Sequence, residues 1–177
     1  MATRQLAHVL VSRDIGLVYG GANVGLMGVL ATAVLEQGGE VIGVIPESLV
    51  DLEIAHRGLT QLHVTQSMHA RKKLMADLSD GFLALPGGIG TLEEIFEMWT
   101  WSQLGLQQKA CGLLNVANYF ASLCAFLDQM VAEKFVKAAH RDFLVVERDP
   151  ERLVTRLCHE VQPYTPKWIG PPSSGQA

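Results

Sequence analysis

The sequence has few charged residues and few cysteines. Of its 177 residues 18% are charged, and 14 lysines and arginines stand against 18 aspartates and glutamates, giving a net charge of −4. No block of basic residues is present, which argues against a nucleic-acid surface. The cysteines Cys111, Cys124 and Cys158 have no C-x-x-C spacing. They predict reduced thiols in a cytoplasmic protein, and neither a disulfide framework nor a zinc site.

Other signals are also missing. No apolar run reaches about 18 residues, so we expect no membrane span. The opening MATRQLAHVLVSRD lacks the apolar stretch and cleavage site of a secretory signal. The histidines His56, His63 and His69 have no spacing typical of a metal site, and no metal is expected. What is present is 49% apolar residues, enough for one globular domain with a full core. We expect residues 1–165 to form this domain and residues 166–177 to be a loose tail.

Short apolar runs alternate with helical periodicity along the whole chain. Strands that are apolar throughout, each followed by a helix, indicate a parallel sheet covered on both faces. The predicted fold class is therefore α/β, a Rossmann-like doubly wound parallel sheet in a single domain. Strands are expected at 16–21, 40–47, 62–65, 81–88, 111–116 and 142–147, and helices at 3–14, 24–39, 67–80, 91–105, 119–135 and 149–161.

Two glycine-rich turns each follow a predicted strand. They are GGANVGLMG at 20–28 and PGGIGT at 86–91. Such turns let backbone N–H groups approach an anion closely, and the following helix N-terminus adds unpaired donors. Neither turn is a Walker A loop or a clean G-x-G-x-x-G motif, and tight turns for packing alone are the alternative. The candidate phosphate-cradle glycines are Gly20, Gly21 and Gly25 of the first turn and Gly87 of the second.

Charged side chains flank the second turn. Thr91-x-x-Glu94 fits a capping box, which from the spacing alone is the more frequent role of such a glutamate. A carboxylate just behind a phosphate cradle makes more sense, however, if positive charge develops beside it. Arg71, in the basic run at 67–73, is either part of an exposed charged face or a bidentate fork for an anion. Glu93 is expected on another side of the helix, in solvent.

These residues carry a resemblance to a known family. Residues 67–105 resemble the LONELY GUY (LOG) family of cytokinin riboside 5′-monophosphate phosphoribohydrolases, long labelled possible lysine decarboxylases. The family pattern P-G-G-x-G-T-x-x-E is met by residues 86–94, with Ile89 where Tyr or Gly is frequent. The upstream pattern M-H-x-R-K is met by residues 68–72. The similarity covers roughly residues 13–160.

The resemblance implies hydrolysis of the N-glycosidic bond of adenosine 5′-monophosphate-type nucleotides, among them cytokinin riboside 5′-monophosphates and AMP, to free base and ribose 5-phosphate. It implies a homodimer that uses no metal or organic cofactor, with Arg71 and Glu94 as the catalytic pair. Lysine decarboxylation usually needs pyridoxal phosphate on a lysine Schiff base, and neither Lys72 nor Lys73 has an evident pyridine-nitrogen partner. The implied substrate contacts are Glu53, Arg71, Lys72, Gly88, Ile89, Gly90, Thr91, Leu92, Glu93, Glu94 and Thr100.

The start of the chain departs from the family, whose members begin with a strand ending in a Gly-Ser-Ser-type turn. A doubly wound sheet normally begins with a strand, often its central one. Without it, the strands at 16–19 and 82–85 must pair directly or leave backbone groups unpaired, at about 1–3 kcal/mol for each buried group. We expect the active protein to carry about 10–25 further residues. If the chain is complete as given, we expect low stability and weak or absent hydrolysis. A non-catalytic, nucleotide-binding remnant is the alternative function.

The helix after the second turn predicts an assembly. Its side chains Phe96, Met98, Trp99 and Trp101 point in several directions, and one helix cannot bury all of them against a single sheet face. Part of this surface is therefore expected to pack on a second copy of the chain. The active site would then lie near the dimer interface, with Thr100 beside it.

Overall fold

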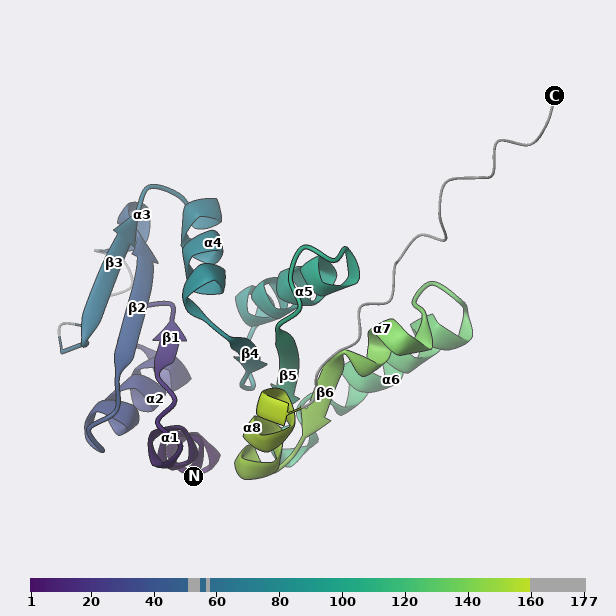
Figure 1. The fold of residues 1–177 in the computed structure, drawn as a ribbon, viewed down its shortest axis with the longest axis horizontal. Coiled ribbons are helices and arrows are strands. Elements are labelled where there is room, and N and C mark those ends of the chain that lie inside the picture. Colours follow the sequence, from purple (N-terminus) through teal and green to yellow (C-terminus); the bar gives the residue numbers. More distant parts are fainter. Residues whose placement is uncertain (51–54, 57, 160–177) are drawn as a thin grey trace.

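The computed structural model describes residues 1–50, 55–56 and 58–159, and Figure 1 shows their arrangement. Each strand is followed by at least one helix, and each predicted strand and helix is present. Glu53 and the predicted tail at 166–177 lie outside the described residues. The elements are α1 (Ala2–Ser12), β1 (Leu17–Tyr19), α2 (Gly25–Leu35), β2 (Val41–Pro46), α3 (Glu47–Val50), β3 (Gln61–Thr65), α4 (Met68–Leu78), β4 (Gly81–Ala84), α5 (Ile89–Gln103), β5 (Ala110–Leu114), η1 (Val116–Asn118), α6 (Ala121–Ala132), α7 (Ala138–Asp142), β6 (Leu144–Glu147) and α8 (Pro150–His159).

The strands are parallel and form two groups of three. The order is β1-β2-β3 in one group and β4-β5-β6 in the other. Val18 lies opposite Ile42 in the first group, and Gly112 lies opposite Val145 in the second. All five residues of β5 are buried, because helices cover both faces of its group. The α/β class with parallel strands flanked by helices in a single domain is thereby confirmed.

The predicted sheet is divided between β1 and β4. Within the described residues these two strands do not pair with each other, and each is the edge of its own group. Of the two outcomes that the sequence left open, direct pairing is thus wrong. A pocket lies between the two edges, lined by Val18 of β1 and by all four residues of β4 (Gly81–Ala84). Figure 1 shows β1 and β4 as the inner strands of the two groups.

One hydrophobic cluster joins the two groups on one face. It brings together Leu6 of α1, Val34 of α2, Leu114 of β5 and Leu153 of α8, each almost completely buried. Helix α1 packs against both α2 and α8 and so bridges the two halves of the molecule. Burial of such side chains contributes about 1.5–3 kcal/mol each, which holds the halves together although their strands do not pair.

A second cluster lies around α5 on the opposite face. Met98 and Trp99 are buried in it, and Phe96 and Trp101 are partly buried against it. The indole N–H of Trp99 donates to the carbonyl oxygen of His140 at 2.8 Å. Helix α6 and strand β5 also contribute to the cluster, so one chain buries Met98 and Trp99 and leaves Phe96 and Trp101 only partly covered. The expectation that part of this α5 surface packs on a second copy of the chain stays a prediction.

Candidate active site

Arg71 is oriented by the sheet. The hydroxyl of Ser67 accepts the N–H of Ala70 at 3.1 Å and caps α4, as the sequence predicts. This places Arg71 in the first turn of α4, where its Nε donates to the carbonyl oxygen of Val44 in β2 at 3.0 Å. Only 6% of Arg71 is exposed. The interpretation of Arg71 as part of an exposed charged face is therefore wrong.

Glu94 faces this arginine from α5. Its Oε1 lies 3.6 Å from Nη2 of Arg71, and 36% of its side chain is exposed. The pair thus joins a buried cation to a carboxylate that reaches solvent. Helix α5 begins at Ile89, with Gly88 at the N-cap. Thr91 lies inside the helix, so the capping-box interpretation of Glu94 is wrong, and its interaction with Arg71 replaces it.

The first glycine-rich turn makes room for the arginine. A Cβ on Gly20 would overlap Nη2 of Arg71. The next residue, Gly21, has φ +79°, and a Cβ there would come 3.2 Å from Cβ of Ile45. Gly25, at the start of α2, has φ +57°. Each of the three glycines is thus required by backbone geometry or by close contact.

The second turn is anchored at one glycine and open at the next. The carbonyl oxygen of Gly87 accepts the Tyr119 hydroxyl at 2.7 Å. By contrast, an added Cβ on Gly88 or Gly90 would meet none of the described residues within 4 Å. Ile89 between them is 87% exposed. This leaves open space at the N-terminus of α5, where unpaired N–H groups favour an anion. Sequence reasoning missed Tyr119, which no local pattern marks.

Lys72 makes two ion pairs instead of facing solvent. Its Nζ lies 2.5 Å from Oε1 of Glu93 and 2.9 Å from Oε2 of Glu97. The hydrogen bond to Glu93 is the main cause that raises the pKa of Lys72. Glu93 is half-exposed, but it is not simply solvated as predicted. Glu97 was missed, although its i,i+4 spacing from Glu93 was a signal that both carboxylates share one helix face.

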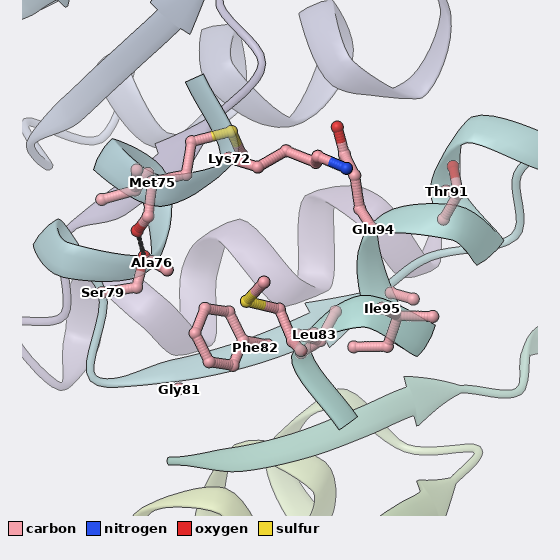
Figure 2. A pocket seen from close by; sticks show the side chains of 13 residues that line it. Lys72, Met75, Ala76, Ser79, Gly81, Phe82, Leu83, Thr91, Glu94 and Ile95 are labelled. Carbon is pink, nitrogen blue, oxygen red and sulfur yellow. Dashed lines mark hydrogen bonds between the residues drawn. The ribbon is translucent and has the colours of Figure 1, made fainter. Parts of the chain in front are cut away.

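The remaining predicted contacts divide into two sets. Thr91 lines the pocket between β1 and β4 together with Lys72 and Glu94. Figure 2 shows the Lys72 side chain extending from α4 toward α5, where Glu94 and Thr91 lie. Leu92 instead packs against the second cluster. Thr100 is exposed further along α5 and does not line the pocket.

The site occupies the point where the strand order reverses. Strands β1 and β4 end in the two glycine-rich turns, and open α/β sheets bind ligands at this position. Within residues 1–50, 55–56 and 58–159 no group of three or more metal-ligating side chains is present. No helix in the same part of the chain is long and apolar enough to cross a membrane. Fold and site together define a Rossmann-like protein with an Arg71–Glu94 pair at its switch point.

Comparison with known proteins identifies the family. A family profile described as "possible lysine decarboxylase" matches residues 27–157. A cytokinin riboside 5′-monophosphate phosphoribohydrolase of Rhodococcoides fascians is 48% identical over 153 residues, which cover 86% of this chain and 77% of that protein. The cytokinin riboside 5′-monophosphate phosphoribohydrolase LOG3 of Arabidopsis thaliana is 44% identical, and the match covers 90% of this chain and 76% of that protein. The chain therefore belongs to the LONELY GUY family, the family that its motifs resemble.

A solved structure supports the fold alone. The molybdenum cofactor binding protein from the phototrophic bacterium Rippkaea orientalis matches with a TM-score of 0.60 and 21% identity, over 85% of this chain and 80% of that chain. At this identity the match shows a shared α/β architecture and says nothing about the ligand.

Proposed function

We propose that this protein hydrolyses the N-glycosidic bond of adenosine 5′-monophosphate-type nucleotides, giving free base and ribose 5-phosphate. The observation that carries the proposal is the contact between Arg71 and Glu94, at 3.6 Å, beside two glycine-rich turns. Support comes from relatives 44–48% identical that are named phosphoribohydrolases. Cytokinin riboside 5′-monophosphates and AMP are the substrates to test.

The chemistry gives each part of the site a role. Cleavage of an N-glycoside passes through an oxocarbenium-like sugar, as other glycoside hydrolysis does. The carboxylate of Glu94 stabilises that positive charge or activates the attacking water. Arg71 holds Glu94 in place, and offers its remaining N–H groups to the sugar or phosphate. The open turn at 88–90 receives the 5′-phosphate and thereby fixes the ribose.

The geometry does not favour a lysine decarboxylase. A Schiff-base lysine needs a lowered pKa, so that its neutral amine can attack. Lys72 is the buried lysine of the site, and its hydrogen bonds to Glu93 and Glu97 raise its pKa. Its amine is therefore held as an ammonium ion. This is the opposite of what the covalent chemistry requires.

A product assay tests the proposal. The protein is incubated with AMP and with an N6-substituted adenosine 5′-monophosphate, and free base and ribose 5-phosphate are measured by chromatography. Adenosine is the matched control, because it has the same glycosidic bond without the phosphate. We expect base release from the nucleotides and at least about 100-fold less from adenosine, since phosphate binding fixes the sugar. Nucleotide binding with no base release would favour the non-catalytic alternative.

We also propose that the protein works as a homodimer in the cytoplasm. Support for the dimer comes from Phe96 and Trp101 of α5, which are only partly buried, and from exposed apolar side chains on the first turn of α2, Leu26 and Met27. Support for the compartment comes from three free cysteines. Sedimentation at micromolar concentration tests the dimer, and a species of 19.3 kDa alone would contradict it.

A further inference from the structure

Tyr119 reaches the second glycine-rich turn from the neighbouring loop. Strands β4 and β5 pair in parallel, with Ala84 opposite Leu113, so the loops that follow them leave the sheet at the same edge. The turn at 86–90 follows β4, and Tyr119 lies in the loop after β5. Its hydroxyl donates to the carbonyl oxygen of Gly87 at 2.7 Å. The hydroxyl of Tyr119 thus connects one loop to the other.

The loop that carries Tyr119 is held by both backbone and side-chain contacts. The N–H of the buried Asn115 donates to the carbonyl oxygen of Glu147 in β6 at 2.7 Å, and its Oδ1 accepts the N–H of Phe120 at 2.8 Å. Phe120 is almost completely buried. Its ring packs edge-on against the ring of Tyr119, with centroids 5.1 Å apart. Tyr119 is therefore attached to a fixed base, although 56% of it is exposed.

Two residues of this loop have left-handed backbone conformations. Ala117 has φ +49° and Asn118 has φ +63°. This region is unfavourable for a residue with a Cβ, and more so for alanine than for asparagine. Such conformations persist where the surrounding contacts determine them, and they are frequent at functional sites. Because the two residues immediately precede Tyr119, they set the direction in which its side chain leaves the loop.

The hydrogen bond from Tyr119 fixes the peptide group between Gly87 and Gly88. This peptide is trans, and in a planar trans peptide the C=O and the N–H point in opposite directions. Because Tyr119 holds the oxygen, the N–H of Gly88 points away from Tyr119. Gly88 is the N-cap of α5. Its N–H therefore adjoins the N–H groups that the first turn of the helix leaves without an intrahelical partner.

The dihedral preferences of Gly87 and Gly88 do not fix this orientation. Glycine accepts positive and negative φ about equally, so the peptide between two glycines can flip. Gly87 has to be glycine, because a Cβ there would overlap Oγ1 of Thr91. A flipped peptide would turn the carbonyl oxygen of Gly87, with its partial negative charge, toward an anion at the start of α5. The favourable orientation must therefore come from a contact, and Tyr119 supplies it.

We propose that Tyr119 is a positioning residue for phosphate binding. Its hydroxyl holds the Gly87–Gly88 peptide so that the N–H of Gly88, and not the carbonyl oxygen of Gly87, faces the 5′-phosphate of the substrate. Tyr119 acts through the peptide and need not touch the ligand. The proposal rests on the proposed function for one point, which is that the turn at 86–90 receives the phosphate.

Tyr119→Phe tests the proposal, because it keeps the ring and removes the hydroxyl. Ser12→Ala is the matched control, since it also removes a hydroxyl that donates to a backbone carbonyl, that of Val9 at the end of α1. Binding of inorganic phosphate and of adenosine to the full chain is measured by amide NMR, with the Gly88 signal as reporter. KM and kcat are measured for AMP. The Tm shows that each variant is folded.

The expected effect is specific for phosphate. We expect Tyr119→Phe to weaken phosphate binding and to raise KM for AMP, each by about 10-fold, because a hydrogen bond to a charged group is lost. The affinity for adenosine should be unchanged, and kcat should change by less than about 3-fold, because the other N–H groups of α5 still hold the bound phosphate. The Tm should fall by no more than about 4 °C. Ser12→Ala should bind phosphate and AMP as the unchanged protein does.

Four results would overturn the proposal. Equal phosphate affinity in Tyr119→Phe and the unchanged protein would show that the peptide keeps its orientation without the hydroxyl. An equal loss of affinity for adenosine and phosphate would show that the whole site is disturbed. A lower kcat with KM unchanged would assign Tyr119 to the chemical step. Absence of phosphate binding to the unchanged protein would remove the premise.

One further result separates this proposal from the proposed function. Phosphate affinity could fall as expected in Tyr119→Phe while neither protein releases base from AMP. That result would support the role of Tyr119 in the phosphate turn and contradict the proposed function alone.

Discussion

The guanidinium of Arg71 lies so close to Gly20 that a Cβ on this glycine would overlap its Nη2 atom. Gly20→Ala is therefore expected to displace Arg71 from Glu94. A shift of about 1 Å in a catalytic group can cost about 100-fold in rate, and we expect a loss of base release of that order. Gly16→Ala is the control, because its Cβ would make an ordinary 3.7 Å contact with Glu40. Unchanged activity in Gly20→Ala would contradict this role.

The second prediction concerns the carboxylate. Glu94→Gln is expected to lower base release by about 100- to 10,000-fold, the range for loss of a general acid or base. Its Tm should change little, because α5 begins at Ile89 and Glu94 does not cap it. Near-normal turnover would exclude a catalytic role for Glu94. Glu151→Gln, which alters a surface pair with Arg13, is the matched control and should be fully active.

The third prediction concerns the arginine. Arg71→Ala is expected to abolish most base release and to lower the free energy of unfolding by about 1–3 kcal/mol, because the buried Val44 carbonyl loses a donor. Denaturant unfolding separates the two effects. If the variant is folded at the assay temperature and as active as the unchanged protein, Arg71 has no part in the reaction.

The fourth prediction separates positioning by Lys72 from substrate binding. Because Glu93 and Glu97 both hold its amine, we expect Lys72→Met to lower kcat while KM changes less than about 3-fold. The double change Lys72→Met with Glu97→Gln should be less destabilising than the two single changes summed. A large rise in KM with kcat unchanged would mean that Lys72 binds the phosphate.

The same lysine predicts a pH dependence of stability. The pKa of Lys72 is raised above its usual 10.5 by hydrogen bonds to Glu93 and Glu97. A raised folded-state pKa contributes stability that is fully present below the unfolded pKa and is lost as the pH rises through the folded value. The stability difference between the unchanged protein and Lys72→Met should therefore be constant from pH 7 to 9 and shrink above about pH 10.5. Denaturant midpoints across this range measure it.

The last prediction concerns the thiols. Burial raises the pKa of Cys111 to about 12, so about 0.01% of it is thiolate at pH 8. Cys158 is exposed and should react with a thiol reagent at once, whereas Cys111 should react only on unfolding. Mass spectrometry of the labelled peptides distinguishes them. Rapid labelling of Cys111 in the native protein would show that the β5 core opens readily.

The sequence predicts the strands well for a physical reason. Strands β2 and β5 are buried on both faces, so apolar runs such as residues 110–114 stand out from the polar turns around them. The glycine-rich turns are also evident from the sequence, because two adjacent glycines, Gly20 and Gly21, are an unusual pair. Each of them is required at its position for steric reasons. The pairing of β1 with β4 could not be decided, since it depends on what lies between two edges far apart in the chain.

Contacts between helices were harder to predict. The capping-box interpretation of Glu94 failed because α5 starts two residues before Thr91, at Ile89, and helix ends depend on the preceding turn. How far one chain covers Phe96 and Trp101 could not be predicted, because α6, which helps to cover α5, follows later in the sequence. Such contacts join residues whose spacing along the chain carries no periodic signal.

The hydrogen bond from Arg71 Nε to the Val44 carbonyl has a thermodynamic consequence. A free arginine loses about 1.5–2 kcal/mol of side-chain entropy when it is fixed. Here β2 fixes the guanidinium plane as the chain folds, at 3.0 Å from a backbone oxygen that cannot rotate away. Binding of a nucleotide therefore restricts no further rotamers of Arg71. The side-chain entropy of Arg71 is therefore lost when the protein folds. It does not reduce the free energy of ligand binding.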